Sequence, residues 1–149
     1  MADKVKTAFL LAGGCAGCEM SVVDLSEALV GALEHLEIVF WAPTVADVKY
    51  KDLEDMPDKS IDLAFVDGMM RNSENLHTVK VLRQKSKILV AFGACATLGG
   101  IAALFQQAPT DAAAAGEPRL HAADKQFGIA RVLFVDAVVD VIAVIQGSA

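Results

Sequence analysis

Short apolar runs alternate with amphipathic stretches along the first hundred residues. A strand of a parallel sheet that is covered on both faces is apolar along most of its length. Four runs have this character and predict buried strands: Val5 to Ala12, Ile38 to Trp41, Ile61 to Val66 and Lys87 to Phe92. Three of them end in glycine-containing turns, which is typical of the carboxyl end of such a strand.

The segments between these runs predict the covering helices. Apolar residues recur at three- and four-residue steps from Ser21 to Leu36, which predicts one amphipathic helix with Ser21 as a possible cap. Asn72 to Lys85 predicts a second helix, and Pro43 to Met56 an irregular or weakly helical crossover. Strand and helix alternate, so we expect an α/β fold with a parallel sheet covered on both faces.

The last third of the chain has a weaker pattern. Leu98 to Gln107 predicts a helix, Ala108 to Phe127 lacks a clear period and predicts a surface excursion, and Arg131 to Ile145 suits a final buried strand and its extension. We find no internal repeat and no linker. Residues 1–149 are therefore expected to form a single domain.

Composition narrows the function classes. Hydrophobic residues make up 54% of the chain and the mean hydropathy is +0.45, which suggests that part of the apolar surface contacts a partner. A net charge of -6 argues against nucleic acid as a ligand. No uncharged apolar run approaches the ~20 residues of a membrane span, and the N-terminus is not a convincing signal peptide. We expect a cytoplasmic protein whose three cysteines stay reduced.

The cysteines carry the candidate chemistry. Cys15 and Cys18 follow the first predicted strand, and Cys95 follows the fourth. In an open parallel sheet the ligand crevice lies beyond the carboxyl ends of the strands, so the fold should bring these three residues together. Two thiolates at C-x-x-C spacing can bind one edge of a metal cluster, and a thiolate from another loop would supply a third ligand.

Other interpretations of these cysteines are open. Cys95 could be a small buried hydrophobe, with Cys15 and Cys18 forming a redox pair as in thioredoxin-like proteins. A zinc site would be incomplete, because no well-spaced fourth cysteine or histidine is present. Glu19 could relay protons or adjust a local potential, although a solvated or helix-starting acid is commoner.

Two further features are weaker. Gly99-Gly100 would let the chain pass close to a cluster or partner, or form a simple turn. The histidines share no spacing and are interpreted as surface residues; they are His35, His77 and His121.

The motifs GGCAGCEMSVVDL, IDLAFVDGMMRNSENLHTVKVLRQKSK and ILVAFGACATLGG resemble the cluster-binding, flavodoxin-like domain of nickel-iron hydrogenase small subunits. The resemblance runs from about Val5 to Gly100 and is strongest to the soluble deazaflavin-non-reducing type that partners heterodisulfide reductase. The 20 kDa subunit of complex I is related. The resemblance implies a three-layer, flavodoxin-like open sheet, and it implies that Cys15, Cys18 and Cys95 are ligands of one proximal 4Fe-4S cluster.

The chain departs from this pattern at the fourth ligand. The family is expected to supply a cysteine from a Pro-Gly-Cys-Pro segment after a valine-rich strand, and this chain has no fourth cysteine. Gln146-Gly147-Ser148 falls where Pro-Gly-Cys would be, so we hypothesise that Ser148 stands at the fourth-ligand position. A seryl oxygen is a poor substitute for a thiolate toward iron.

The resemblance implies an electron-transfer subunit of a hydrogenase complex that is not catalytic alone. The expected partners are a hydrogenase large subunit, which would hold the nickel-iron centre, and a further iron-sulfur or flavin subunit, with heterodisulfide reductase as one candidate. One alternative is the small subunit of a complex-I-like or other oxidoreductase without nickel. Another is a structural flavodoxin-like subunit with no cluster.

Overall fold

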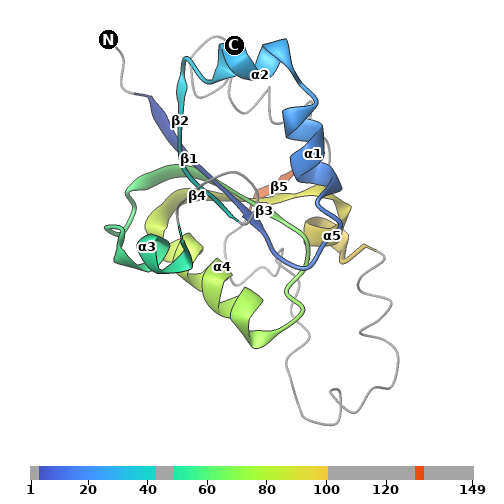
Figure 1. Ribbon diagram of the computed structural model, residues 1–149. Coiled ribbons are helices and arrows are strands. Elements are labelled where there is room, and N and C mark those ends of the chain that lie inside the picture. Colours follow the sequence, from blue (N-terminus) through green and yellow to red (C-terminus); the bar gives the residue numbers. More distant parts are fainter. Residues whose placement is uncertain (1–3, 43–48, 101–129, 133–149) are drawn as a thin grey trace.

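The computed structural model describes residues 4–42, 49–100 and 130–132, which contain one parallel sheet (Figure 1). Its spatial order is β2-β1-β3-β4-β5, and all neighbouring strands pair in parallel. The strands are β1 (Val5–Leu11), β2 (Leu36–Ala42), β3 (Ile61–Asp67), β4 (Ser86–Phe92) and β5 (Ala130–Val132). The predicted α/β fold with a parallel sheet is confirmed.

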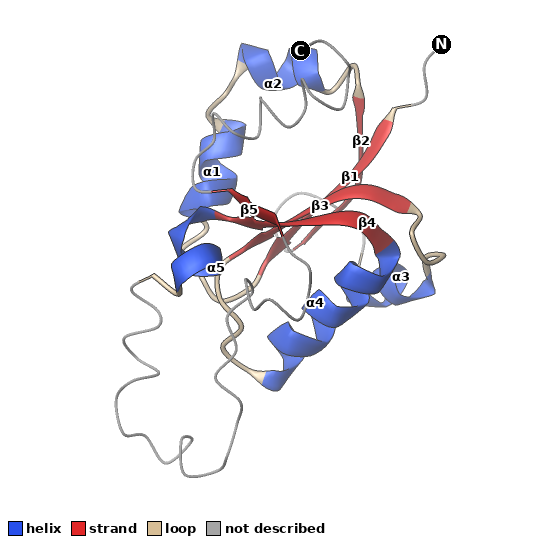
Figure 2. Ribbon diagram, turned by 180° about the vertical axis from the view of Figure 1, so that it is seen from behind, coloured by secondary structure: helices blue, strands red, loops and turns tan. Residues whose placement is uncertain are grey.

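Helices lie on both faces of the sheet, as expected for three layers (Figure 2). One face packs α3 (Tyr50–Asp55) and α4 (Ser73–Lys85) against small and branched strand residues, through Leu53, Val79 and Leu82. The other face is aromatic, and α1 (Gly17–Val23) and α2 (Glu27–Ala32) pack against it through Val22 and Leu29. Because successive strand residues point to opposite faces, both cores are built from the same apolar runs.

Three predicted strands and one helix are confirmed almost to the residue. The run from Val5, the run from Ile61 and the run ending at Phe92 all form strands. Asn72 caps α4, since its side chain accepts a hydrogen bond of 2.8 Å from the backbone N–H of Asn75. Strand β2 begins at Leu36, two residues before the predicted start, because Leu36 pairs with Val5 at the beginning of the sheet.

The single helix predicted from Ser21 to Leu36 is wrong. Two short helices occupy this region, and the chain turns between them at Ser26, whose φ is 50°. The Ser26 hydroxyl donates to the carbonyl of Asp24 over 3.2 Å, a local bond that competes with helix continuation. Ser21 is not the cap: it lies inside α1, where its hydroxyl donates to the carbonyl of Cys18 over 2.6 Å.

The segment after β4 also differs from the prediction. No loop precedes the helix: α5 (Gly93–Leu98) starts directly after β4, contains Cys95 and is closed by Gly99. In the helix predicted from Leu98 to Gln107, Leu98 is instead the last residue of α5, Gly99 and Gly100 are not helical, and residues 101–107 lie outside the described residues. The prediction assumed that a loop separates a buried strand from the next helix, whereas α5 begins at the residue that follows β4.

Other predictions are confirmed in part. The weakly helical crossover contains α3, whose first turn is closed by a 2.7 Å bond from the Lys49 N–H to the Asp52 carboxylate. The final strand is present as β5, paired with β4. Residues 43–48, 108–127 and 133–145 lie outside the description. Among the described helices, none has the length and apolar character needed to cross a membrane.

Candidate functional site

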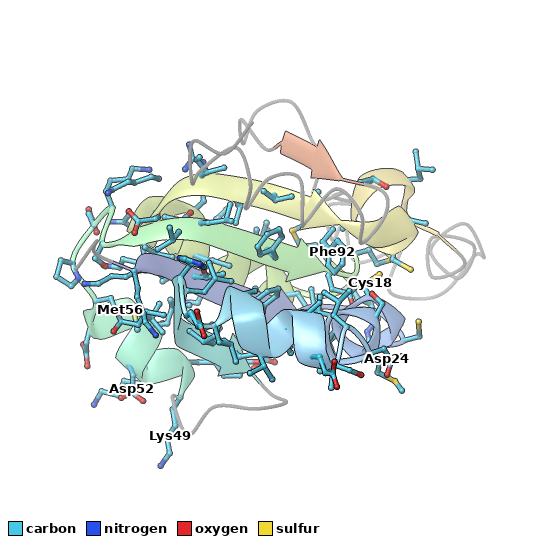
Figure 3. All side chains as sticks on the ribbon, turned by 90° about the horizontal axis from the view of Figure 1, so that it is seen from above. Cys18, Asp24, Lys49, Asp52, Met56 and Phe92 are labelled. Atoms are coloured by element: carbon cyan, nitrogen blue, oxygen red, sulfur yellow. The ribbon has the colours of Figure 1, made fainter. Side chains whose placement is uncertain are left out.

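The carboxyl ends of β1, β3 and β4 meet at one edge of the sheet. Leu11 pairs with Asp67, and Asp67 pairs with Phe92, so the three segments that follow begin side by side. The first two are tied together by reciprocal backbone hydrogen bonds between Gly13 and Met69, of 2.8 and 3.0 Å. This register places the cysteine-bearing segments after β1 and β4 around the end of β3, and Figure 3 shows Cys18 beside Phe92.

Each cysteine sulfur lies against a glycine. A Cβ added at Gly17 would lie 3.3 Å from Sγ of Cys15, and one at Gly100 would lie 2.6 Å from Sγ of Cys95. A Cβ at Gly93 would overlap Sγ of Cys18 outright. The chain thus brings backbone close to each sulfur, an approach that a residue with a Cβ would obstruct. Gly99 and Gly100 have φ values of 89° and 55° and form the turn that ends α5, which is the simple-turn alternative.

Asp67, the last residue of β3, lies between these segments. It is only 4% exposed, and its carboxylate accepts hydrogen bonds from the thiol of Cys18 and from the backbone N–H groups of Gly68 and Glu19. Burial raises the pKa of this carboxyl above its ordinary value, and these hydrogen bonds partly offset the increase. Sequence reasoning did not single out Asp67, although an acid at the carboxyl end of a buried strand is an available signal.

Burial and neighbouring acidic groups disfavour ionisation of the thiols of Cys18 and Cys95. The pKa of Cys18 is raised to about 12, first by burial, then by the charge and hydrogen bond of Asp67, and then by Cys15 and Cys95. Burial, Asp67 and Cys15 also raise the pKa of Cys95. In the metal-free chain these two groups are therefore neutral thiols near pH 7, and a bound cation would have to displace their protons.

Glu19 lies in the first turn of α1 and is 2% exposed, so the interpretation as a solvated acid is wrong and that as an acid at the start of a helix is confirmed. It lines a hollow of about 130 Å³ with Trp41 and Met20. His35 and His77 are exposed, as predicted, and His77 contacts Glu54 at 2.9 Å. Within the described ranges, no three His, Cys, Asp or Glu side chains are grouped closely enough for a single metal ion.

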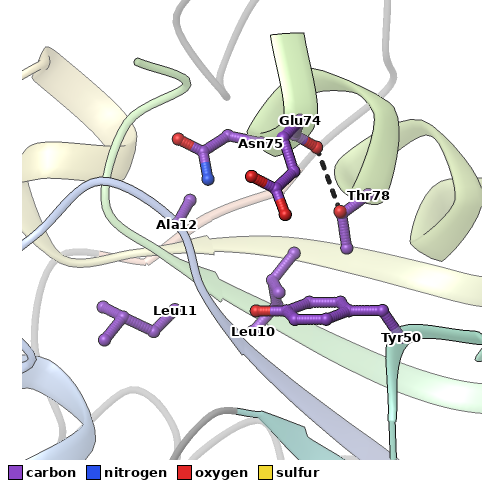
Figure 4. A pocket seen from close by; sticks show the side chains of 7 residues that line it. All are labelled: Leu10, Leu11, Ala12, Tyr50, Glu74, Asn75 and Thr78. Atoms are coloured by element: carbon purple, nitrogen blue, oxygen red, sulfur yellow. Dashed lines mark hydrogen bonds between the residues drawn. The ribbon is translucent and has the colours of Figure 1, made fainter. Parts of the chain in front are cut away.

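A second hollow lies against α3 and α4 (Figure 4). Its volume is about 200 Å³, and its lining combines apolar residues from the end of β1 with Tyr50, Glu74, Asn75 and Thr78. Burial and the charges of Glu74 and Glu19 raise the pKa of Tyr50. None of the cysteines lines this hollow, and Tyr50 is 42% exposed, so we place the candidate chemistry at the cysteine edge instead.

Comparison with known proteins identifies relatives of this chain. The family model described as the 20 kDa subunit of NADH ubiquinone oxidoreductase matches residues 15–148. The iron-sulfur subunit of the F420-non-reducing hydrogenase of Archaeoglobus profundus is 75% identical over 97 residues, which are 65% of this chain and 30% of that protein. The corresponding vhu F420-non-reducing hydrogenase subunit of Methanococcus voltae is 41% identical over 104 residues, which are 70% of this chain and 33% of that protein.

A solved structure shares the fold. A chain of an NAD+-reducing NiFe-hydrogenase in the H2-reduced state superimposes with a TM-score of 0.62 at 26% identity, covering 80% of this chain and 68% of that one. The resemblance to hydrogenase small subunits is therefore confirmed. The chain spans about a third of the length of the two curated relatives described above.

Proposed function

Because this chain belongs to the family of the 20 kDa subunit of NADH ubiquinone oxidoreductase, we propose that it binds one 4Fe-4S cluster through Cys15, Cys18 and Cys95 and transfers electrons within a hydrogenase complex. Such a cluster, when bound, supplies one-electron transfer. The observation that carries the proposal is that the segments bearing the three cysteines follow strands that end side by side, so that Cys15 and Cys95 both lie close enough to Cys18 to raise its pKa.

The residues present fit this group in two further respects. Glycines next to the sulfurs allow backbone N–H groups to approach sulfide, which is one of the ways in which proteins tune clusters. Cys18 packs against the aromatic core of the sheet face that α1 and α2 cover. In this core the ring of Phe65 stacks on that of Phe9 with centroids 4.9 Å apart and meets that of Phe92 edge-on with centroids 6.0 Å apart. A low dielectric beneath the thiols affects the potential of any bound redox group.

The complex belongs to the same proposal. A partner large subunit would hold the nickel-iron centre, and a further iron-sulfur or flavin subunit, heterodisulfide reductase among the candidates, would exchange electrons with this chain in the cytoplasm. Apolar side chains near the cysteines are exposed and would contact such partners: Met20 at 61%, Val23 at 50% and Leu98 at 68%. The excess hydrophobicity of the chain is consistent with this surface.

The test is anaerobic iron and acid-labile sulfide analysis of the chain purified with its partners, together with an electron paramagnetic resonance (EPR) spectrum after dithionite reduction. We expect about four irons and four sulfides in this chain, and a reduced-cluster signal that is lost in the Cys18→Ser and Cys95→Ser variants. Ser21→Ala is a matched control on α1. A colourless chain in an intact complex would refute the proposal and support the cluster-free structural alternative.

The partner assignment has its own test. Nickel analysis of the copurified large subunit, with a dihydrogen-dependent dye-reduction assay, distinguishes the hydrogenase from the complex-I-like alternative. We expect nickel and dihydrogen oxidation. A large subunit without nickel, beside a chain that holds its cluster, would leave the cluster assignment standing and reject the hydrogenase assignment.

A further inference from the structure

The turn that carries the C-x-x-C cysteines is poorly fixed by its own residues. Helix α1 begins at Gly17, and its cap position is occupied by Ala16, whose side chain has no oxygen to accept a hydrogen bond. Ala16 also has a φ of 62°, in the left-handed region that a residue with a Cβ rarely adopts. Contacts from elsewhere in the chain therefore have to keep this turn in place.

One backbone donor at the start of α1 shows where such a contact comes from. The first intrahelical hydrogen bond of α1 runs from the N–H of Met20 to the carbonyl of Ala16 over 2.9 Å. The N–H of Glu19, one residue earlier, belongs to the first turn, whose N–H groups have no acceptor within a helix. It donates instead to the carboxylate of Asp67, the last residue of β3. A side chain of a strand thus replaces the missing local cap.

The carboxylate of Asp67 makes two more contacts at this edge. It accepts the thiol hydrogen of Cys18 and the backbone N–H of Gly68, so it joins an expected ligand and the start of α1 to the chain that leaves β3. Asp67 is 4% exposed, and its Oδ2 has no hydrogen-bond partner among the described residues, so Oδ1 is the accepting oxygen. Oδ1 faces the cysteine-bearing segments, since it lies 3.6 Å from a Cβ added at Gly14 and 3.9 Å from one added at Gly93.

We propose that Asp67 is a positioning residue, which fixes the C-x-x-C segment on the end of β3 and orients the Cys18 sulfur toward the place of the cluster. This inference rests on the proposed function, because the arrangement matters only if the three thiols bind a common group. The cysteines bind iron, and Asp67 only accepts hydrogen bonds. When the Cys18 sulfur binds iron, its thiol proton leaves to solvent, and the hydrogen bonds from the N–H groups of Glu19 and Gly68 still fix the turn.

Asparagine and alanine at position 67 separate the accepting oxygen from the negative charge. Asp67→Asn can keep an oxygen at the place of Oδ1 and put its amide nitrogen at the place of Oδ2, where no hydrogen bond is lost. Asp67→Ala removes the acceptor altogether. Positioning through Oδ1 therefore predicts that the asparagine variant resembles the wild type and the alanine variant does not. An effect of the charge would appear in both variants.

The matched control is Asp62→Ala. Asp62 lies near the opposite end of the same strand, and its Oδ2 also accepts a backbone N–H, that of Lys6, over 2.9 Å. Its substitution removes a carboxylate that joins two segments of the chain, as Asp67→Ala does, but at the edge of the sheet away from the cysteines. A mere loss of stability should therefore appear in both alanine variants, and an effect on the cluster only in Asp67→Ala.

The measurement uses the full chain reconstituted anaerobically with iron and sulfide. The rate of iron release to a chelator measures how firmly the cluster is bound, and the EPR spectrum after dithionite reduction reports the surroundings of the cluster. We expect Asp67→Ala to release iron about tenfold faster than the wild type, as the loss of hydrogen bonds implies, and to show shifted g values. Asp67→Asn should stay within about twofold of the wild-type rate. Asp62→Ala should match the wild type in both readouts.

A measurement on the wild-type chain needs no variant and remains decisive if Asp67→Ala fails to fold. In the metal-free chain, NMR hydrogen exchange should show the N–H of Glu19 to be protected like that of Met20, which has an intrahelical acceptor. Exchange of the Glu19 N–H at the rate of an unstructured peptide would overturn the proposal.

The outcomes separate the two proposals. A wild-type chain without iron refutes the proposed function, and with it the role of Asp67. Unchanged iron release and an unchanged EPR spectrum in Asp67→Ala overturn this role and leave the proposed function intact. An equal change in Asp67→Asn and Asp67→Ala assigns the effect to the charge, and an equal change in Asp67→Ala and Asp62→Ala assigns it to lost stability; either result also overturns positioning through Oδ1.

Discussion

Replacing Gly93 with alanine tests whether the backbone at the end of β4 positions the Cys18 sulfur. Gly93 has a φ of 82°, in the left-handed region that residues with a Cβ rarely adopt, and the new Cβ would overlap Sγ of Cys18. The sulfur is the end of a side chain and can rotate away. We therefore expect strain and a displaced thiol, and not a collapsed fold.

The magnitude follows from these two terms. A left-handed conformation costs alanine about 1–2 kcal/mol, and rotation of Cys18 adds little in the metal-free chain. The free energy of unfolding should fall by this amount, which corresponds to a decrease in melting temperature of about 2–8 °C for a chain of this size. The loss of iron should be much larger than this stability change suggests, because one of three thiols is displaced from the site.

The control is Gly31→Ala. Gly31 lies within α2, and an added Cβ meets no atom within 4 Å. Alanine is favoured over glycine inside a helix by about 0.5–1 kcal/mol, so this variant should be slightly more stable and should keep its iron.

The assay is urea denaturation of the metal-free chain, followed by iron analysis after anaerobic reconstitution. A Gly93→Ala variant that retains wild-type stability and wild-type iron would refute the argument. It would show that the close approach of Gly93 to Cys18 has no role in positioning the thiol.

Three other outcomes are expected. Gly68→Ala should lower the free energy of unfolding by about 2–5 kcal/mol, because the new Cβ would meet the backbone of Gly13 at 2.8–2.9 Å and the φ of Gly68 is 89°. Urea denaturation measures this change, and an unchanged free energy of unfolding would contradict the prediction. The metal-free chain should keep its stability up to about pH 9 and lose it as the pH rises toward 12, because the Cys18 thiol ionises at lower pH in the unfolded chain than in the folded chain. Melting temperatures of the wild type and of Cys18→Ala across this range test the prediction. An equal slope of melting temperature against pH in the two proteins would contradict it. Phe65→Ala should lower the free energy of unfolding by about 3–5 kcal/mol, because it opens a cavity in the aromatic face. Ile88→Ala, at a side chain 46% exposed, should lower it by about 0.5 kcal/mol. Equal decreases in the two variants, measured by urea denaturation, would contradict this packing.

Several features of the fold are determined by the local sequence. The runs that form β1, β3 and β4 are mostly apolar, because a strand covered on both faces buries most of its side chains. The period of α4 and its Asn72 cap are equally local signals. Where strands and helices alternate, right-handed crossover connections make neighbouring strands parallel, so the residues that follow each strand lie at the same edge of the sheet. The position of the three cysteines at this edge was therefore predictable.

Tertiary structure decided the features that depend on contacts between distant residues. The turn at Ser26 interrupts a pattern that is periodic enough for one helix, and α5 begins at Gly93 without a loop. The pairing of Gly93 with Cys18 joins residues 75 positions apart, and no local pattern specifies which glycine will meet which sulfur.

Asp67 shows the same limit most directly. In sequence it is an acid at the end of an apolar run, a position that is usually solvated. Only the packing of the segments that follow β1, β3 and β4 makes it a buried carboxylate beside Cys18, with one oxygen that has no partner in the described chain. The sequence by itself determined the residue types at the site and the edge of the sheet where they lie. The environment of each group, and therefore its chemistry, depended on burial and on neighbours that only the folded chain brings together.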